Sequence, residues 1–370
     1  MVLTNLYGLD FVSLQPLKQH FMGIDIQLVK ESRIDSIDFN NLNFGRTFTD
    51  HMFVCDFSDG EWKNQTIKPY GPMMFDPSAR VFHYGQAVFE GMKAFKDDND
   101  DVFLFRPEDN YDRINASANR LAMPSVPKEV FFEGLNKLLK LDKNWIKKGA
   151  GNSLYIRPFM IATEGAIAAS PAEEYKFIII CSPAQSYYAG EVRVIFAEEY
   201  SRSANGGVGF AKAAGNYAAQ FYPTRLANEE GYQQIIWTDA NTHEYLEEAG
   251  TMNIFFRVGD KLITTPTNDR ILDGITRKSI IQLAEDNNIT VEIRKVSVAE
   301  IKEAAKIGEL KEIFGSGTAA VINPIKGFKH QEDVFELPNI TDSYATFFKE
   351  KLVNIQYNKV EDKHNWRVKI

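Results

Sequence analysis

The lysine with the most informative surroundings is Lys212, which lies in the segment GGVGFAKAAGNY. Its neighbours are small and uncharged, so no ion-pair partner stands close to it in the sequence. An amine that is removed from water loses its proton more readily and becomes a nucleophile that can form a Schiff base. Composition alone favours a plainer interpretation, a solvated lysine in a flexible glycine-rich loop. The surroundings of Lys212 by themselves therefore leave its role open.

Carboxylates and arginines supply further candidates. Glu247 and Glu248 precede an apolar segment in YLEEAGTMNIFF, and a buried carboxylate there needs a protonated ring nitrogen or a structural arginine as its partner. A guanidinium group can bind phosphate through two hydrogen bonds at once. Arg113 lies on a predicted helix among polar residues, where an exposed arginine is the ordinary case. Arg157 interrupts the apolar segment SLYIRPF, so it is expected to form an internal salt bridge or to receive an anion.

Two short segments have the pattern of backbone anion sites. In ILDGITR, Gly274, Ile275 and Thr276 stand at a predicted helix start, where free amides bind phosphate unless they serve only for capping. GSGTAA, residues 315 to 320, resembles a dinucleotide fingerprint but lacks its strand–turn–helix context and acidic partner. It is interpreted as a glycine-rich turn whose amides can face an anion. Four aromatic residues, for which core packing is the alternative to binding, are Phe44, Tyr84, Tyr155 and Tyr187.

Metal binding has no support in the sequence. Four residues match positions of a calcium-binding loop, namely Asp97, Asn99, Asp101 and Glu108. The glycine that such a loop requires is replaced by Val102, and predicted strands flank the segment where helices are needed. The six histidines form no HxH or HxxxH pair, and CxxC is absent. We therefore predict no metal site.

Composition describes an acidic globular protein. The chain has 370 residues, of which 44% are hydrophobic and 25% are charged, and its net charge is −8. This length predicts two domains. No basic stripe of the kind that binds nucleic acid occurs, and no apolar run approaches the ~20 residues of a membrane span. Two isolated cysteines and the lack of a signal peptide predict a cytoplasmic protein, with residues 1 to 22 treated as an extension.

Helix and strand patterns predict two α/β halves with mixed sheets. In the first half, residues 1 to 185, the main predicted strands are 46–58, 102–105, 153–163 and 176–182, and the helices are 107–121 and 129–148. Residues 186 to 190 lack a clear period and are predicted to connect the halves. In the second half, residues 191 to 370, the main predicted strands are 233–239, 251–258, 261–266 and 290–298, and the helices are 216–231, 275–288 and 343–352.

Eight segments, in one order, resemble a known family. They are FGRTFTDHM, FHYGQAVFEGMKAF, LFRPEDNYDR, SLYIRPF, AKAAGNY, EEAGTMNIFF, ILDGITR and FGSGTAAVINP. Together they resemble the branched-chain amino-acid aminotransferases, of fold type IV among pyridoxal-phosphate enzymes, over about residues 30 to 360. The most specific part is AKAAGNYAAQ with EEAGTMNIFF.

The resemblance implies a cofactor site for pyridoxal 5'-phosphate. Lys212 looks like the lysine that forms a Schiff base with the cofactor. Glu248 looks like the carboxylate that keeps the pyridine nitrogen protonated, so that the ring acts as an electron sink. Tyr217 is similar to the residue that hydrogen-bonds the ring oxygen. The other implied cofactor contacts are Arg113, the amides of Ile275 and Thr276, Thr318 and Thr251.

The resemblance also implies the substrate contacts. The turn Thr318–Ala319 would receive the substrate α-carboxylate through backbone amides, and Arg157 would admit the side-chain carboxylate of glutamate. The pocket for the apolar side chain would be lined by Phe44, Tyr84, Tyr155, Tyr187 and Thr251. Some relatives carry CxxC after this turn. Ala320 and Asn323 occupy those positions here, so no thiol–disulfide control is expected.

The implied activity is transamination of leucine, isoleucine and valine with 2-oxoglutarate, by ping-pong kinetics, in a homodimer. The nearest rivals are other fold type IV enzymes, a D-amino-acid aminotransferase or an aminodeoxychorismate lyase. A non-catalytic binding protein on the same fold is the rival from another class. The sequence does not rank the three substrates, because one methylene group changes specificity by only ~1–3 kcal/mol.

Overall fold

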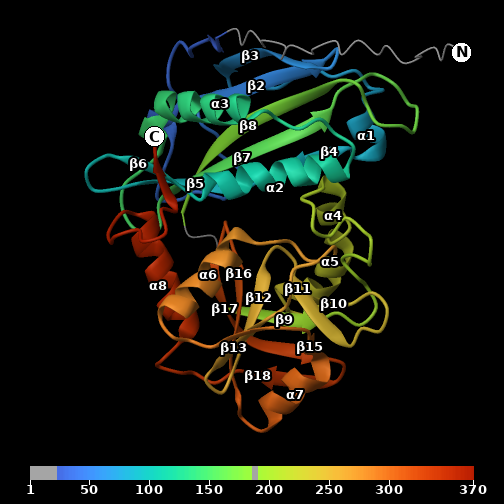
Figure 1. Ribbon diagram of the computed structural model, residues 1–370. Coiled ribbons are helices and arrows are strands. Elements are labelled where there is room, and N and C mark those ends of the chain that lie inside the picture. Colours follow the sequence, from blue (N-terminus) through green and yellow to red (C-terminus); the bar gives the residue numbers. More distant parts are fainter. Residues whose placement is uncertain (1–22, 186–190) are drawn as a thin grey trace, which may run out of the picture.

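The computed structural model describes residues 23 to 185 and 191 to 370. Two β-sheets organise this part of the chain (Figure 1). The strands of the first sheet are β1 (Asp25–Ile26), β2 (His51–Ser58), β3 (Glu61–Pro69), β4 (Ala87–Phe89), β5 (Met92–Lys96), β6 (Val102–Phe105), β7 (Ser153–Ala162), β8 (Tyr175–Ala184) and β19 (Arg367–Lys369). Their order is β1-β3-β2-β8-β7-β5-β6-β19, and β4 pairs with β7.

The second sheet is formed by the later part of the chain. Its strands are β9 (Val192–Phe196), β10 (Gln234–Thr238), β11 (Tyr245–Ala249), β12 (Asn253–Val258), β13 (Lys261–Thr264), β14 (Val291–Ile293), β15 (Val296–Ser297), β16 (Leu310–Gly317), β17 (Val321–His330) and β18 (Asp333–Glu336). Their order is β14-β13-β12-β16-β17-β9-β10-β11-β15, and β18 pairs with β17. Parallel pairs such as β9 with β10 stand beside antiparallel ones, so the predicted mixed α/β class is confirmed.

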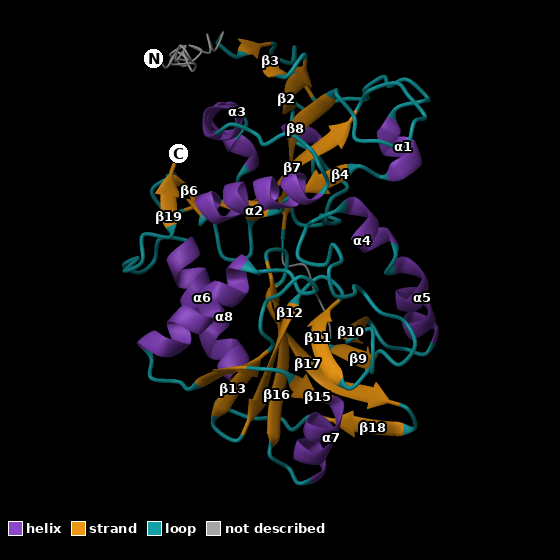
Figure 2. Ribbon diagram, turned by 45° about the vertical axis from the view of Figure 1, so that its right-hand side comes forward, coloured by secondary structure: helices purple, strands orange, loops and turns teal. Residues whose placement is uncertain are grey.

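Helices lie on both sheets and between them (Figures 1 and 2). They are α1 (Arg80–Tyr84), α2 (Pro107–Arg120), α3 (Lys128–Leu141), α4 (Ala214–Ala218), α5 (Phe221–Glu229), α6 (Ile275–Asp286), α7 (Val298–Lys306) and α8 (Tyr344–Gln356), with short 3-10 turns η1 (Ile34–Ser36) and η2 (Lys143–Trp145). Figure 1 shows α2 and α3 with the first sheet in the upper half, and α7 at the far end of the second sheet. None of the helices in the described ranges is long and apolar enough to cross a bilayer.

Helix α2 illustrates how the sequence positions the site. Pro107 stands at the start of the helix, where its missing N–H leaves no hydrogen bond unmade. Ile114 and Ala118, one turn apart, are fully buried in the core of the first half. Ser117 is also buried, one turn after Arg113, so the helix turns these two polar side chains away from solvent as well. The helix that the apolar spacing predicts thus presents Arg113 to the interior.

Several elements differ from the sequence-based expectation. One helix is predicted over residues 216 to 231, whereas the structure has two, α4 and α5. The predicted strand 290–298 is divided into β14 and β15, and its last residue begins α7. Strands β1, β3, β11, β18 and β19 are not predicted from the sequence. Polar side chains alternate along β3, and pairing with β2 on one side and β1 on the other makes this segment a strand.

The predicted domain limits stay a proposal. The chain passes from the first sheet to the second between Ala184 and Val192. The predicted connector, residues 186 to 190, and the extension, residues 1 to 22, lie outside the described residues. Strand β19 pairs with β6, so the end of the chain belongs to the first sheet although the predicted second half runs to residue 370.

Candidate active site

A cavity of about 430 Å³ lies between the two halves of the chain. Figure 2 shows that mostly loops and turns fill the space between α2 and the second sheet. The first half contributes to the lining Phe44, Phe89, Gly91, Arg113, Tyr155 and Arg157. The second half contributes, among others, Arg202, Lys212, Tyr217, Glu248, Thr251, Ile275, Thr276 and residues 316 to 320. The fold therefore brings the predicted anion-binding and nucleophilic groups into one cavity.

Lys212 is held firmly by its surroundings. Its backbone amide donates to Ser117 Oγ at 2.9 Å, and its carbonyl accepts from the Phe89 amide at 3.1 Å. The side chain of Asn216 donates to the carbonyls of Val208 and Ala211 and closes the glycine-rich segment. A flexible, solvated loop is therefore the wrong interpretation of this segment, because hydrogen bonds tie it to α2 and to β4.

The Lys212 amine points into the cavity. Its Nζ donates to Tyr217 Oη at 2.9 Å and lies 4.9 Å from the centre of the Phe89 ring. Tyr217 stands on α4, whose first turn begins two residues after Lys212. The tyrosine and the phenylalanine restrict the amine to one region of the cavity, next to the other predicted site residues.

Glu248 is a buried carboxylate at the end of β11. One oxygen lies 2.7 Å from the Arg202 guanidinium and 3.3 Å from the Leu272 amide, and the other accepts from Asn253 Nδ2 at 3.3 Å. Burial raises the pKa of Glu248 to about 7 although Arg202 opposes this rise. Arg202 is the structural arginine that the sequence left as one alternative. Glu248 nevertheless also lines the cavity, so its carboxylate is available to a bound ligand.

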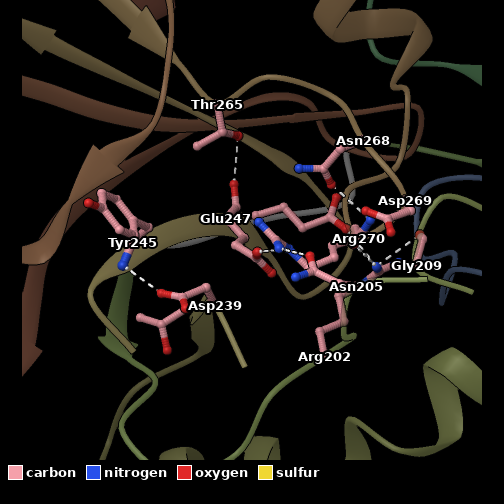
Figure 3. A network of polar contacts seen from close by, with 12 residues as sticks. Arg202, Asn205, Gly209, Asp239, Tyr245, Glu247, Thr265, Asn268, Asp269 and Arg270 are labelled. Atoms are coloured by element: carbon pink, nitrogen blue, oxygen red, sulfur yellow. Dashed lines mark hydrogen bonds and ion pairs between the residues drawn. The ribbon is translucent and has the colours of Figure 1, made fainter. Parts of the chain in front are cut away.

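The neighbouring Glu247 has a different environment, in which Figure 3 shows Arg270 and Thr265 beside it. It forms an ion pair with Arg270 at 2.5 Å, and its carbonyl accepts from Thr265 Oγ1 at 2.8 Å. Arg270 also contacts Asn205. Successive side chains on a strand face opposite sides, so β11 necessarily separates the two glutamates. Glu247 is therefore structural, and Glu248 is the carboxylate of the cavity.

The pKa of Glu248 predicts a pH-dependent stability. Because the folded-state pKa of about 7 lies above the ordinary 4.5, the folded protein binds this proton more tightly than the unfolded chain. This proton contributes about 3 kcal/mol to the free energy of unfolding, and the contribution is complete below pH 4.5. It is lost as the pH rises through 7. In denaturant titrations of the cofactor-free wild type, the free energy of unfolding should therefore be lower at pH 7.5 than at pH 4.5. In Glu248→Gln, this difference should be smaller by about 3 kcal/mol.

The control for this measurement is Glu244→Gln, which changes an exposed carboxylate on the same segment and should keep the wild-type pH dependence. Parallel pH profiles for the wild type and Glu248→Gln would contradict the assignment.

Arg113 is not an exposed helix arginine. Its side chain is 12% exposed, and its Nε and Nη2 donate to the two oxygens of Glu90 at 2.6 and 2.9 Å. Nη1 donates to the Asp273 carbonyl at 3.1 Å. These bonds use three of the five N–H groups of the guanidinium and leave two for an anion in the cavity.

The sequence analysis did not include Glu90 among the candidate site residues. Burial would raise the pKa of its carboxyl group, but Arg113, the Lys212 charge and the Asn110 amide together lower that pKa below its ordinary value. The Asn110 side chain donates to it at 2.7 Å. An acidic residue inside the apolar segment VFEGMKAF is the available signal, by the same logic that singled out Arg157.

The start of α6 offers backbone donors to the same region. No side chain caps this end, and Ile275 and Thr276 are buried and line the cavity. A Cβ atom on Gly274 would overlap with Asn253 Oδ1, so only glycine allows this approach. Free amides at the start of a helix, beside Arg113, form a site suited to a phosphate group.

The turn between β16 and β17 lies on another wall of the cavity. It consists of Thr318, Ala319 and Ala320, all of which line the cavity. Within the part of the chain that the structure describes, the amides of Thr318, Ala319 and Ala320 donate no hydrogen bond. Free amides beside a cavity are suited to a carboxylate.

Arg157 forms no ion pair with any described residue. Its Nη2 donates to Tyr155 Oη at 2.9 Å, its guanidinium lies 4.6 Å from the centre of the Phe89 ring, and its buried Nε has no hydrogen-bond partner. This favours the anion-receptor alternative over an internal salt bridge. A Cβ atom on Gly91 would overlap with Tyr155 Oη, so glycine is required beside this tyrosine.

Among the described residues, one predicted pocket residue, Tyr84, does not line the cavity of its own chain. Tyr84 is 49% exposed, and its hydroxyl donates to the Ile167 carbonyl. Neither of these two residues lines the cavity. Tyr187 lies outside the described residues. Phe44 and Tyr155 do line the cavity, with their ring centres 4.9 Å apart. No cluster of three potential metal ligands occurs among residues 23 to 185 and 191 to 370.

Comparisons with known proteins place the chain in a family. The amino-transferase class IV family model matches residues 87 to 328. A probable branched-chain-amino-acid aminotransferase of Staphylococcus epidermidis is 46% identical over 92% of this chain and 97% of its own length. The branched-chain aminotransferase of Thermoproteus uzoniensis with norvaline has a TM-score of 0.71 at 24% identity, covering 86% of this chain and 99% of that one. The branched-chain amino acid aminotransferase of Thermobaculum terrenum in its PLP-form has a TM-score of 0.68 at 19% identity, covering 86% and 98%.

Site, fold and family model together define a class IV aminotransferase. Within that class, the chain belongs to the branched-chain-amino-acid aminotransferases, as the identity to the Staphylococcus epidermidis relative establishes. The family that the sequence motifs resemble is thereby confirmed.

Proposed function

We propose that this chain is a pyridoxal-phosphate-dependent aminotransferase that transfers the amino group between branched-chain L-amino acids and 2-oxoglutarate. Leucine, isoleucine and valine would give the corresponding 2-oxo acids, and 2-oxoglutarate would give L-glutamate. The observation that carries the proposal is a single cavity that combines a fixed amine, a buried carboxylate and two groups of free backbone amides. The activity of the curated relatives agrees with this proposal. The same relatives support neither of the two rival fold type IV activities.

The residues of the cavity fit pyridoxal 5'-phosphate. Its phosphate matches the start of α6 and the two remaining N–H groups of Arg113, its ring nitrogen matches the Glu248 carboxylate, and its ring oxygen matches the Tyr217 hydroxyl. The Thermobaculum terrenum neighbour, solved in its PLP-form, has the same fold. When bound, the cofactor supplies an electron sink for the negative charge that develops at the substrate Cα.

The chain's own residues supply positioning and proton transfer. Lys212 would hold the cofactor covalently between turnovers and would remove the proton from the substrate Cα. Tyr217 keeps the amine in place through the 2.9 Å hydrogen bond. Arg202 fixes the orientation of the Glu248 carboxylate at 2.7 Å, so that this group is already aligned before a ligand binds.

Substrate recognition uses the remaining walls of the cavity. The amides of the Thr318–Ala319 turn receive the α-carboxylate, with Thr251 close by. Phe44 and Tyr155 provide the apolar wall, and the contributions of Tyr84 and Tyr187 stay predictions. Arg157, which has no ion-pair partner in the described chain, receives the side-chain carboxylate of glutamate or 2-oxoglutarate.

Replacing Arg157 by glutamine should separate the two half-reactions. We expect kcat/KM for 2-oxoglutarate to fall about 100-fold, because one charge-assisted pair contributes ~3 kcal/mol, while kcat/KM for L-leucine changes only about threefold. Steady-state rates with each substrate varied would measure this, with Arg193→Gln, a half-exposed arginine on β9 that pairs with Glu336, as the matched control. An equal decrease for both substrates would assign Arg157 a structural role.

We further propose a homodimer. Large apolar side chains are exposed around α1, namely Met74, Phe82, Tyr84 and Ile167. Tyr84 contacts the Ile167 carbonyl, and Phe82 packs against Phe75, so these side chains occupy one area. An apolar area of this kind is typical of an interface between chains. Light scattering of the purified protein tests this proposal, and a mass of one chain would contradict it.

Steady-state rates on L-leucine, D-alanine and aminodeoxychorismate test the proposed function directly. Transamination of L-leucine with 2-oxoglutarate, and a visible absorbance of bound cofactor, are expected. Activity confined to D-alanine would contradict the substrate assignment, and a protein without cofactor absorbance or activity would support the non-catalytic rival. A cytoplasmic location stays a prediction.

A further inference from the structure

A second lysine lies behind the wall of the cavity that holds the β16–β17 turn. Lys93 stands on β5, and its side chain is buried, with a relative exposure of 8% for the residue. Its Nζ donates to the Ala319 carbonyl at 2.8 Å, although the two residues are 226 positions apart. A small space behind the turn is lined by Lys93 together with Gly317 and Thr318, so Lys93 reaches the turn from the side opposite the main cavity.

The charge of Lys93 is not balanced by the chain around it. No described carboxylate forms an ion pair with its Nζ. Burial, with a smaller contribution from the nearby Lys349, lowers the pKa of Lys93 to about 8, and no acidic group opposes this shift. A buried ammonium group without an anion is unfavourable. Its placement next to a cavity that receives anions indicates that a bound ligand supplies the missing negative charge.

The hydrogen bond from Lys93 reaches the cavity through one peptide group. The Ala319 carbonyl and the Ala320 N–H belong to the same peptide bond. A cationic donor at the carbonyl oxygen polarises that peptide and makes its N–H a stronger donor. The Ala320 amide has no hydrogen bond within the described chain, and Ala320 lines the cavity.

The turn is also held in a strained conformation. Gly317 pairs with Val321, which leaves a three-residue loop between them. Val321, the first residue after this loop, has φ 61°, in the left-handed region that ordinarily favours glycine. A β-branched residue in this region is unfavourable and persists only where the surroundings hold it. Lys93 supplies one such restraint at Ala319.

We propose that Lys93 is a positioning residue for the substrate α-carboxylate. It fixes the turn of residues 318 to 320 and strengthens the Ala320 amide as a donor, without touching the substrate itself. This inference rests on the proposed function, because it takes the turn to be the site that receives the carboxylate.

The test compares Lys93→Met with Lys96→Met in the holoenzyme. Lys96 is a close match, since it lies on the same strand, has the same 8% exposure, and donates to a backbone carbonyl, that of Lys143, at 2.9 Å. It does not line the cavity. Lys93→Met should raise KM for L-leucine, and Ki for 4-methylvaleric acid as a carboxylate probe, by about tenfold or more. In the same variant, kcat should change less than about threefold. Lys96→Met should leave KM and Ki unchanged.

Two further readouts distinguish positioning from general destabilisation. Cofactor absorbance should be unchanged in Lys93→Met, and Lys93→Arg, which keeps the cation, should restore most of the affinity. If Lys93→Met does not fold, Lys93→Gln keeps a donor without the charge, and the same selective rise in KM and Ki is expected. Unchanged KM in the Lys93 variants, or equal effects at Lys93 and Lys96, would overturn the inference. A wild-type protein without activity on L-leucine would instead overturn the proposed function.

Discussion

Replacing Lys212 by alanine is expected to reduce kcat for transamination by about 10⁴-fold or more, since the covalent attachment of the cofactor and the transfer of the Cα proton are lost together. Among the described residues that line the cavity, no other lysine can replace this amine. Tyr217 Oη lies 2.9 Å from Nζ but is a weak base, and Lys93 lies behind the turn. Single-turnover assays with L-leucine would measure the loss.

A covalent label checks the same assignment independently of the rate. Borohydride treatment of the holoenzyme should attach the cofactor to the peptide that contains Lys212, and mass spectrometry should find no such label in Lys212→Ala. Lys351→Ala, an exposed position on α8, is the matched control and should keep activity and label. Full activity in Lys212→Ala, or a label on another lysine, would contradict the proposed role.

The second large effect is expected at Glu90, a residue that does not touch the cofactor in our proposal. Glu90→Gln removes the negative charge that balances the buried Arg113 guanidinium. Leaving one partner of a buried ion pair alone destabilises a protein by about 3–5 kcal/mol. Arg113 also loses its orientation, so pyridoxal phosphate should bind more weakly. Denaturant titration of the cofactor-free protein and cofactor titration by absorbance would measure the two effects.

A double variant separates stability from binding at this pair. Glu90→Gln combined with Arg113→Met should recover part of the lost stability, because no unpaired charge remains, yet it should not recover cofactor affinity. Lys128→Leu breaks the exposed pair Lys128–Glu108 and is the control, with an expected effect of about 0–1 kcal/mol. If Glu90→Gln kept the stability and the cofactor affinity of the wild type, the ion pair between Glu90 and Arg113 would contribute to neither.

The sequence by itself determined the local features of this protein. The start of α2 follows from Pro107 and from the spacing of Ile114 and Ala118, and the glycine at the start of α6 indicates an anion site. These are properties of neighbouring residues, because capping and helical period depend on positions a few residues apart. The ordered motifs also identify the family, which the comparisons confirm.

Only the tertiary structure decided which polar and charged groups contact one another. Glu90 and Arg113 are 23 positions apart, and Lys93 and Ala319 are 226 apart, so no local period relates them. Their contacts depend on the order of strands in a sheet and on how the two halves meet. The exposed position of Tyr84 has the same origin, since its sequence motif does not say which surface it occupies.

The two adjacent glutamates show most clearly what the sequence alone does not determine. The sequence places Glu247 and Glu248 together and indicates that one carboxylate is buried, and the family resemblance selects Glu248. The physical reason lies in β11, a strand not predicted from the sequence, whose alternation directs Glu247 to Arg270 and Glu248 to the cavity. A strand is stabilised by its partners in the sheet, and those partners are distant in the sequence, so this part of the site was decided by the tertiary structure alone.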